Sequence, residues 1–381
     1  MTTDFAKITD EMVEKMRLRV GPRRPSRNRW NEVATRDAIK HWAWGVGDDN
    51  PLWVDREYAS RTKHGGIIAP PTFLYSTSVG PLGPGSSPSR GTGLPGIHAL
   101  HTGDSWEFFE PVREGDEIRL ESETLEPVRK RSSYVGQMVQ QNHVTRYYNQ
   151  RDRLVATMTG HAMSTERGTP KEYNKYGDLA PWRYSDDELK VIADQYASEE
   201  PRGSAPIDWN TVRVGSEIPR RLKGPLTTTS MITYLMGWGS PFCMTDRIAH
   251  EYMRNHPGAN VQDGPTRVPD FPERAHWDEW LYREIGFPLG YDIGTQRVSW
   301  FAHLLTDWLG DEGRIKRMIV LMRKPNWMTD ITWCCGRILE ASVIDGEPTV
   351  RLELWGETQR GHTHATGDAE VVLGNVTNLP R

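Results

Sequence analysis

The chain has 381 residues, enough for two domains of ordinary size, and its formal net charge of −4 offers no extended basic face to a nucleic acid. No apolar run reaches the roughly 18 residues of a membrane-spanning helix, and the first residues do not resemble a signal peptide. Three cysteines, two of them adjacent (Cys334 and Cys335), provide neither a disulfide framework nor metal-ligand spacing, so we expect a reduced cytoplasmic protein without a metal or cofactor.

The N-terminal part of the chain predicts helices. Residues 35–47 begin with a capping Thr and place apolar side chains at helical spacing. A second, short helix is predicted over residues 55–62. A longer helix is predicted over residues 72–79, directly after Pro70 and Pro71, which suit a first helical turn.

A loop and then strands follow these helices. Residues 80–97 are dominated by Gly, Pro and Ser and predict a loop, and we expect its part over residues 83–96 to lie over a bound substrate. Alternating residues on both sides of the turn Pro111–Asp116 then predict strands over residues 105–108, 118–122, 133–148 and 153–165.

The same order of elements appears a second time. Helical spacing recurs over residues 230–237 and 299–308, and strands are predicted over residues 317–323, 331–341, 349–355 and 366–373. The last strands of both halves follow similar words, Asn149-Gln150-Arg151 and Thr358-Gln359-Arg360. Helices followed by antiparallel strands, twice, predict an α+β protein with its helices on one face of a sheet.

The polar, proline-containing stretch between the two copies predicts a connection. It covers residues 168–222 and includes one predicted helix over residues 185–197. We therefore expect one domain over residues 1–167 and a second over residues 223–381.

The loop Gly47-Asp48-Asp49-Asn50-Pro51-Leu52-Trp53-Val54-Asp55 resembles the signature of the MaoC-like (R-specific) enoyl-CoA hydratases, which runs roughly Gly-Asp-x-Asn-Pro-x-His-x-Asp. Gly65–Phe73 and Pro111–Asp116 extend this resemblance to the FAS1-like dehydratase region. The second half resembles the partner domain of the long acyl dehydratases more loosely, through His276-Trp277-Asp278, Gly290–Gly294 and Gln296-Arg297.

The resemblance implies a fold and an activity. The fold is a double hotdog, in which each half wraps an antiparallel sheet around one long helix and the two sheets pair. The activity is that of a hydro-lyase, an acyl-CoA hydratase or dehydratase that adds water reversibly to a 2-enoyl thioester. The resemblance also implies an acyl chain lying between the two hotdogs and a homodimer or higher oligomer.

In that family an Asp and a His, five positions apart on the loop, move the protons. Asp48 stands at the position of this Asp and Asn50 at that of a structural Asn, but Trp53 replaces the His. An indole has no accessible lone pair and cannot act as a base, so the first half cannot run this dyad alone. Asp48 and Asn50 alternatively only cap and brace the loop, and we expect Asn50 and Trp53 to shape the acyl site.

The second half supplies a histidine at the matching position. His276 precedes Asp278 by two residues, as Trp53 precedes Asp55. The residue five positions before His276 is Phe271, which is not an acid. His276 is therefore predicted to be catalytic with a partner from elsewhere, with Asp278 on the substrate side; a structural role for His276 is the alternative.

Asp292 is the main candidate for that partner, and Asp270 lies near His276 as well. Asp292 directly precedes the second central helix, whose N-terminal N–H groups near Gly294 favour a negative charge. Arg297, at the entrance of this helix, is predicted to bind a phosphate of the coenzyme or, alternatively, to form a surface ion pair.

Two other functions compete with the hydratase. A thioesterase on the same fold would use Asp48 or Asp292 as nucleophile or base. A non-catalytic acyl-thioester-binding subunit of a hydratase complex would need neither. The Asp-x-Asn-Pro loop favours the hydratase, whereas the lack of an Asp and His at family spacing in either half favours the binding subunit. The sequence leaves open the acyl group and the choice between coenzyme A and a carrier protein.

Overall fold

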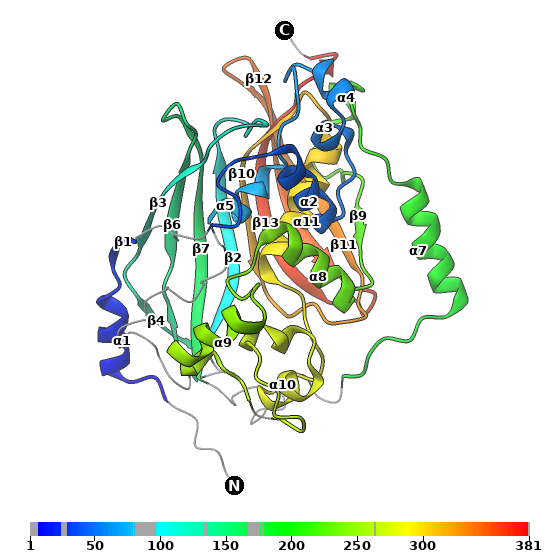
Figure 1. The fold of residues 1–381 in the computed structure, drawn as a ribbon. Helices are drawn as coiled ribbons and strands as arrows, with labels where there is room; N and C mark the ends of the chain where they lie inside the picture. The colour runs from blue at the N-terminus through cyan, green and yellow to red at the C-terminus, as the bar shows by residue number, and fades with distance from the viewer. Residues whose placement is uncertain are drawn as a thin grey trace.

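A computed structural model of the chain describes residues 7–23, 29–78, 80, 97–132, 136–166, 176, 179–262 and 264–379 (Figure 1). The predicted loop over residues 83–96 lies outside this described part. Twelve of the described strands form one large sheet with helices packed against it, in agreement with the predicted α+β class.

The sheet contains strands from both halves of the chain. The first half contributes β1 (Gly21–Arg23), β2 (Ile97–Phe108), β3 (Arg119–Thr124), β6 (His143–Tyr148) and β7 (Leu154–Glu166), with the hairpin of β4 (Val128–Ser132) and β5 (Gly136–Gln140) attached to β7. The second half contributes β9 (Arg221–Lys223), β10 (Arg314–Met322), β11 (Thr332–Ile344), β12 (Glu347–Glu357) and β13 (Thr363–Val372). A separate parallel pair joins β8 (Ile207–Asp208) to β14 (Val376–Thr377).

The two halves meet where β2 pairs antiparallel with β10, with Gly103 opposite Leu321 and Glu107 opposite Arg317. Outward from this seam the first half runs β2-β7-β6-β3-β1 and the second runs β10-β13-β12-β11-β9. Each strand on this path in one half thus has a counterpart at the same place in the other, whereas the β4–β5 hairpin belongs to the first half alone among the described strands. The structure therefore contains the repeat that the sequence predicts.

The register of the loops follows the same repeat. Ile68 bridges to Arg113 in the first half, and Tyr291 bridges to Trp327 in the second. The next residue in each half donates its backbone N–H to the carbonyl just before the bridge partner. Ala69 donates to Val112 in the first half, and Asp292 donates to Asn326 in the second. Tyr291 and Asp292 therefore correspond to Ile68 and Ala69.

The similar Gln-Arg segments, Gln150-Arg151 and Gln359-Arg360, have a structural cause. Asp116 lies in the turn between β2 and β3, and its Oδ1 accepts a hydrogen bond from Gln150 at 3.0 Å. Asp330 lies in the equivalent turn of the second half, and its Oδ1 accepts from Gln359 at 2.9 Å and from Arg360 at 2.7 Å. Each Gln thus anchors the turn of its own half to the end of the last hairpin.

Three helices fill the space in front of the sheet (Figure 1). They are α2 (Arg36–Val46), α8 (Thr228–Trp238) and α11 (Gly294–Leu309). α2 and α8 cross at Gly45 and Gly237, where a Cβ added to Gly237 would lie 2.7 Å from the carbonyl oxygen of His41. α11 is buried along most of its length and forms the centre of the second half.

The central helix of the first half is shorter than α11 in the described residues. It begins as the 3₁₀ turn η1 (Pro71–Leu74) and continues as α5 (Tyr75–Ser78). Pro71 stands at its first position, as predicted. The hydroxyls of Ser76, Thr77 and Ser78 donate to carbonyls three residues earlier, a local bonding pattern that competes with a regular helix.

Smaller helices complete the structure. The predicted connection contains α7 (Asp186–Ser198), which lies outside the second half in Figure 1 and begins with a Ser185–Glu188 capping box. The others are α1 (Asp10–Arg17), α3 (Pro51–Val54), α4 (Arg56–Ser60), α9 (Asp246–Asn255), α10 (Glu279–Glu284), η2 (Trp209–Thr211), η3 (Pro257–Ala259) and η4 (Pro272–His276). Across the described part of the chain, no helix combines the length and apolarity needed to span a membrane.

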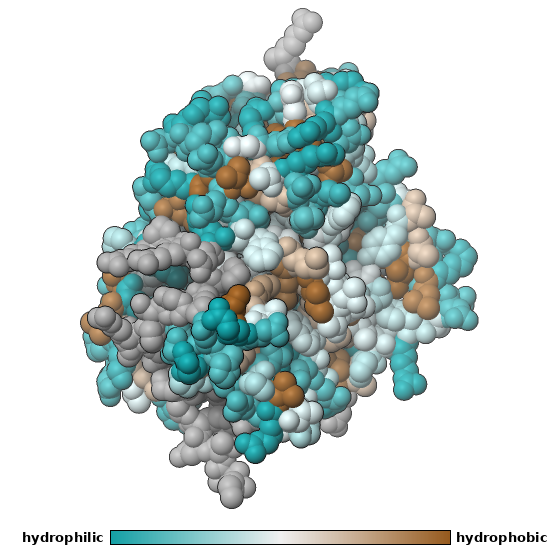
Figure 2. Space-filling view, viewed as in Figure 1, coloured by the Kyte–Doolittle hydropathy of each residue, from teal (hydrophilic) through white to brown (hydrophobic). Residues whose placement is uncertain are grey.

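The surface in front of these helices is mainly hydrophilic, with apolar side chains exposed over α8 and α7 (Figure 2). They include Ile232 and Met236 on α8 and Leu189 and Val191 on α7. Single exposed apolar side chains of this kind are common on protein surfaces. The predicted oligomer remains a prediction.

Candidate active site

The loop after α2 folds around short hydrogen bonds of its own. Gly47 ends α2 in the left-handed conformation, with φ of 70°. The next residue, Asp48, is buried, and its Oδ1 accepts from the backbone N–H of Asn50 at 3.1 Å. Asn50 in turn accepts from the N–H of Leu52 at 3.0 Å and caps α3. Asp48 and Asn50 therefore both brace this loop.

Trp53 is buried on α3, at the place of the family histidine. Its indole N–H has no hydrogen-bond partner among the described residues. Two residues later Asp55 caps α4 by accepting from the N–H groups of Glu57 and Tyr58. Trp53 therefore contributes apolar bulk and no proton chemistry to the first half.

Asp48 also faces the second half, through a group that we call the junction cluster: Asp48, Arg221, Lys223, His303 and Asp307. Nε2 of His303 on α11 lies 3.7 Å from Oδ1 of Asp48 and 2.8 Å from Oδ2 of Asp307. Nζ of Lys223 on β9 lies 2.5 Å from Nδ1 of His303. It also donates to the carbonyls of Val46 and Gly47, at 3.0 and 3.1 Å.

The electrostatics of the junction cluster leave His303 without a free lone pair. Burial lowers the pKa of His303 to about 3, so its ring is neutral at pH 7. Because Lys223 donates to Nδ1, the ring proton lies on Nε2 and points to Asp307. Burial raises the pKa of Asp48, and it raises the pKa of Asp307 to about 6. His303 therefore cannot replace the missing histidine of the first half as a base.

The ligand atoms of Asp48, His303 and Asp307 lie within 4.8 Å of one another, a spacing that would suit a small metal ion. Two cations already occupy this space, however. Lys223 binds His303, and Nε of Arg221 lies 2.6 Å from Oδ2 of Asp307. A divalent ion would meet both positive charges at short range, so the donor set fits a charge-balanced contact between the halves better than a metal site.

The second half has the same loop start with different chemistry. α8 ends at Gly239 with φ of 73°, as α2 ends at Gly47. The next residue, Ser240, is fully buried and accepts from the N–H of Phe242 at 3.0 Å, as Asp48 accepts from Asn50. Ser240 is thus the counterpart of Asp48, a residue that sequence reasoning missed. The sequence could have shown this equivalence through two similar segments, Gly45-Val46-Gly47-Asp48 and Gly237-Trp238-Gly239-Ser240.

His276 lies at the end of η4, two residues before the helix cap. Asp278 caps α10 by accepting from the N–H of Leu281, as Asp55 caps α4, so the predicted register of His276 with Trp53 holds. Nδ1 of His276 lies 2.8 Å from the carbonyl oxygen of Tyr291. A carbonyl only accepts, so Nδ1 carries the proton and Nε2 carries the lone pair. Burial lowers the pKa of His276, which keeps the ring neutral.

The predicted pairing of His276 with Asp292 is not formed in the described structure. Both carboxylate oxygens of Asp292 accept from Arg297, with Nε to Oδ2 at 2.6 Å. Arg297 is buried, and its Nη1 donates to the carbonyls of Lys324 and His364 at 2.8 and 3.2 Å. Arg297 therefore forms a buried ion pair rather than a surface one, and its N–H groups serve the protein instead of a coenzyme phosphate.

A further histidine meets the start of α11. A Cβ added to Gly294 would lie 2.2 Å from Nδ1 of His101, so any larger residue there would displace the His101 ring. Nε2 of His101 lies 2.9 Å from Oδ2 of Asp104, which also accepts from the hydroxyl of Tyr75. Burial opposes ionisation of Asp104, but His101 and Tyr75 together hold its pKa below the usual range. This polar chain was not predicted, because Tyr75 of α5 and the two β2 residues His101 and Asp104 come from separate elements.

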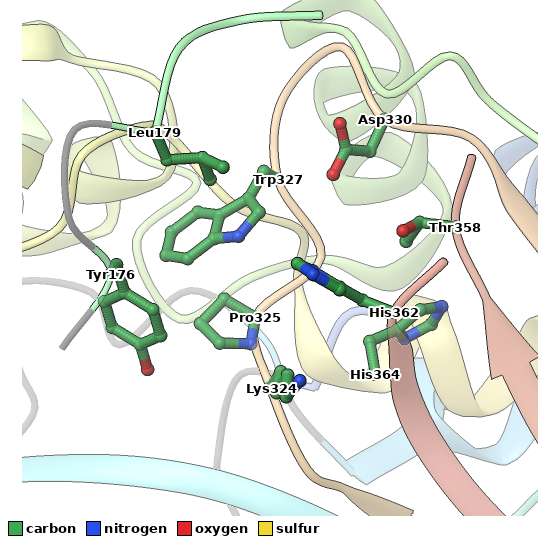
Figure 3. Close-up of a pocket in the computed structure, with 9 residues that line it drawn as sticks. All are labelled: Tyr176, Leu179, Lys324, Pro325, Trp327, Asp330, Thr358, His362 and His364. Carbon is green, nitrogen blue, oxygen red and sulfur yellow. The ribbon is translucent and has the colours of Figure 1, made fainter. Parts of the chain in front are cut away.

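A pocket of about 200 Å³ lies between the turn over residues 324–330 and residues 358–364. Figure 3 shows Trp327 with Leu179, Tyr176 and Pro325 on one side and with His362, His364 and Thr358 on the other; Lys324 and Asp330 complete the lining. The lining includes none of the predicted site residues.

Comparison with known proteins finds a family similarity in the first half. Residues 24–158 match the model of the "FAS1-like, dehydratase domain region". The match contains the Asp48 loop, so the resemblance predicted from the sequence is confirmed.

Three curated relatives match the chain in part. A UPF0336 protein of Streptomyces griseus is 34% identical over 94 residues, which cover 25% of this chain and 61% of the relative. A 3-hydroxybutyryl-CoA dehydratase of Methylorubrum extorquens is 33% identical over 103 residues, 26% of this chain and 60% of the relative. A probable enoyl-CoA hydratase alpha subunit of Thermomonospora curvata is 27% identical over 138 residues, 31% of this chain and 41% of the relative. The chain thus spans about three fifths of the first two relatives and less of the third.

Solved structures show the fold. A MaoC-like dehydratase superposes with a TM-score of 0.58 at 17% identity, covering 93% of this chain and 98% of that chain. A conserved hypothetical protein of Mycobacterium tuberculosis, described as a double hotdog, gives 0.53 at 10% identity, with 90% and 92% covered. The predicted double hotdog is therefore confirmed.

Proposed function

We propose that the protein is a hydro-lyase that adds water reversibly to a 2-enoyl thioester of coenzyme A, with its active site in the second half. The observation that carries this proposal is the state of His276, a neutral imidazole whose Nδ1–H is fixed by Tyr291 and whose Nε2 holds the lone pair. Two partial relatives carry the names of an enoyl-CoA hydratase subunit and a 3-hydroxybutyryl-CoA dehydratase, which supports this class of reaction.

The reaction needs a base for water, an acid for the α-carbon and donors for the enolate-like oxygen. His276 has the lone pair for the first task. The start of α11 offers the third, because the first N–H groups of a helix have no partner within the helix and the helix dipole favours a negative charge there. His276 lies near this helix start, because its Nδ1–H donates to the carbonyl of Tyr291, three residues before Gly294.

The first half then has a supporting role. Its histidine position holds Trp53, and Asp48 lies in the junction cluster. The neighbouring His303 has both ring nitrogens engaged. We infer that the first half shapes the acyl site and braces the second half through this cluster.

The thioesterase alternative loses support from the geometry. Asp292 would have to act as nucleophile or base, yet both of its oxygens accept from Arg297. Asp48 is buried among the junction cluster and accepts from Asn50. Neither carboxylate is placed for attack on a thioester.

The non-catalytic binding subunit remains the competing function, because Trp53 and Ser240 each replace one member of the family dyad. An activity test decides between the two. Purified chain is given short, long, branched and aromatic 2-enoyl-CoA thioesters, and loss of the enoyl absorbance is followed. We expect turnover with at least one of them. Tight thioester binding without turnover would establish the binding subunit instead.

The His276→Gln variant tests the assigned base. We expect a loss of about 10²-fold or more in kcat, because general acid–base groups contribute about 10²- to 10⁴-fold. The matched control is His250→Gln, the same change at an exposed position on α9, which should leave kcat unchanged. Equal activity of the two variants would remove His276 from the chemistry.

A further inference from the structure

In the second half Ser240 replaces the loop carboxylate Asp48, and a carboxyl group from η4, that of Glu273, lies beside it. Ser240, the counterpart of Asp48, directs its hydroxyl to Oε1 of Glu273 at 2.5 Å. Glu273 belongs to η4, at the end of a stretch between Ser240 and η4 that has no equivalent in the first half. The bond therefore brings a carboxyl group to the place where the first half carries Asp48.

Ser240 is well suited to hold this carboxyl group. Its oxygen accepts from the N–H of Phe242, so its own proton is free to point to Glu273. Two residues after Ser240 and two residues before Glu273, the rings of Phe242 and Phe271 stack with centroids 5.2 Å apart in one apolar cluster. Glu273 thus has one oxygen fixed by Ser240, beside an apolar cluster.

Glu273 and His276 are three residues apart on a 3₁₀ turn. Side chains at positions i and i+3 of a 3₁₀ helix eclipse each other, separated by a rise of about 6 Å. Both side chains therefore project from the same edge of η4. A carboxyl group and an imidazole at this spacing leave room for a water and a double bond between them.

The surroundings shift the pKa values of Glu273 and His276 in opposite directions. Burial raises the pKa of Glu273, and nearby Asp270 adds to this, against the hydrogen bond from Ser240. Burial lowers the pKa of His276. Two titratable groups whose environments separate in this way form the arrangement of an acid and a base.

We propose that Glu273 is the acid of the second-half site, that His276 is its base, and that Ser240 positions Glu273. This inference rests on the proposed function. His276 takes a proton from water through Nε2 as the water oxygen bonds to the β-carbon and the π bond between the α- and β-carbons breaks. Glu273 gives its carboxyl proton to the α-carbon. The proton on His276 then passes to the Glu273 carboxylate through solvent, which restores both groups with one water added.

The first test is Glu273→Gln, which keeps the size and the hydrogen bond from Ser240 but removes the acid. We expect kcat to fall by about 10²-fold or more while KM changes by less than about threefold. The matched control is Glu279→Gln, the same change at an exposed residue of α10 that pairs with Arg283, and it should keep full activity. A kcat of Glu273→Gln within about threefold of wild type overturns the proposal.

The second test is rescue, which a merely structural role for Glu273 would not produce. Because Ser240 stands where Asp48 stands in the first half, Ser240→Asp in the Glu273→Gln background restores a carboxyl group to the family position. We expect at least about a tenfold recovery of kcat over Glu273→Gln alone, and no recovery would overturn the assignment. If Glu273→Gln does not fold, Ser240→Ala replaces it; about a tenfold lower kcat supports the proposal, and wild-type kcat overturns it.

The outcomes separate this inference from the proposed function. If wild type hydrates no enoyl-CoA, both fail. If wild type is active and His276→Gln is not, while Glu273→Gln is fully active, only the role of Glu273 fails.

Discussion

The junction cluster predicts a large loss of stability when Lys223 is replaced by Met. The change keeps a side chain of similar length and removes the ammonium, which now donates to the carbonyls of Val46 and Gly47 and to Nδ1 of His303. Each buried acceptor left unpaired costs about 1–3 kcal/mol. Part of that sum is offset because the buried ammonium no longer has to be desolvated, so we expect a net loss of about 3–5 kcal/mol, as for other broken buried pairs.

The assay is urea unfolding at pH 7, followed by tryptophan fluorescence and far-ultraviolet circular dichroism. The matched control is Lys190→Met on α7, an exposed lysine paired with Asp194, which should change stability by less than about 0.5 kcal/mol. In the Lys223→Met background, Asp48→Asn should cost less than it does in wild type, because Asp48 has lost its nearby cation. A loss below about 1 kcal/mol for Lys223→Met would refute the description of this cluster as the junction between the halves.

Three further predictions concern other parts of the structure. Burial holds the pKa of His303 at about 3 in the folded state, below the unfolded value of about 6.5. Between these two pH values the unfolded state binds one more proton than the folded state, so the free energy of unfolding falls as the pH drops from about 6.5 toward about 3. His303→Gln should therefore lose less stability than wild type between pH 7 and pH 5 in urea unfolding, and parallel losses would contradict the assigned burial. Arg297→Lys should lower the free energy of unfolding by about 3–5 kcal/mol and the melting temperature with it, whereas Arg283→Lys on the surface should change neither. Normal stability with a raised KM for Arg297→Lys would instead indicate a coenzyme contact. Gly237→Ala should cost about 1–3 kcal/mol because its Cβ meets α2, whereas Gly258→Ala, in open space, should be nearly neutral; equal melting temperatures would show that the α2–α8 crossing adapts.

The fold was largely predictable because its signals are local. The spacing of apolar residues after Thr35, the proline before the first central helix and the alternation in the strands each predict an element without knowledge of its neighbours. The shared Gln-Arg words indicated the repeat, and the structure gives the reason in the bonds of Gln150 and Gln359 to their turn aspartates.

The site was predictable only where the repeat fixed it. His276 could be aligned with Trp53 because both lie two residues before a helix-capping Asp. Asp292 was assigned to the wrong partner, because nothing in its local sequence shows that Arg297, five residues later, folds back onto it. The bond between Ser240 and Glu273 spans 33 residues, and no local pattern predicts a contact at that distance along the chain.

The central claim is that chemistry resides in the second half, and one side-by-side rate comparison tests it most directly. Wild type, His276→Gln and Asp48→Asn are assayed on the best enoyl-CoA of the panel, with melting temperatures measured for all three. The account predicts that His276→Gln loses about 10²-fold or more in kcat while Asp48→Asn stays within about tenfold of wild type. The opposite order, with Asp48→Asn inactive and His276→Gln active, would contradict it and place the active site in the first half.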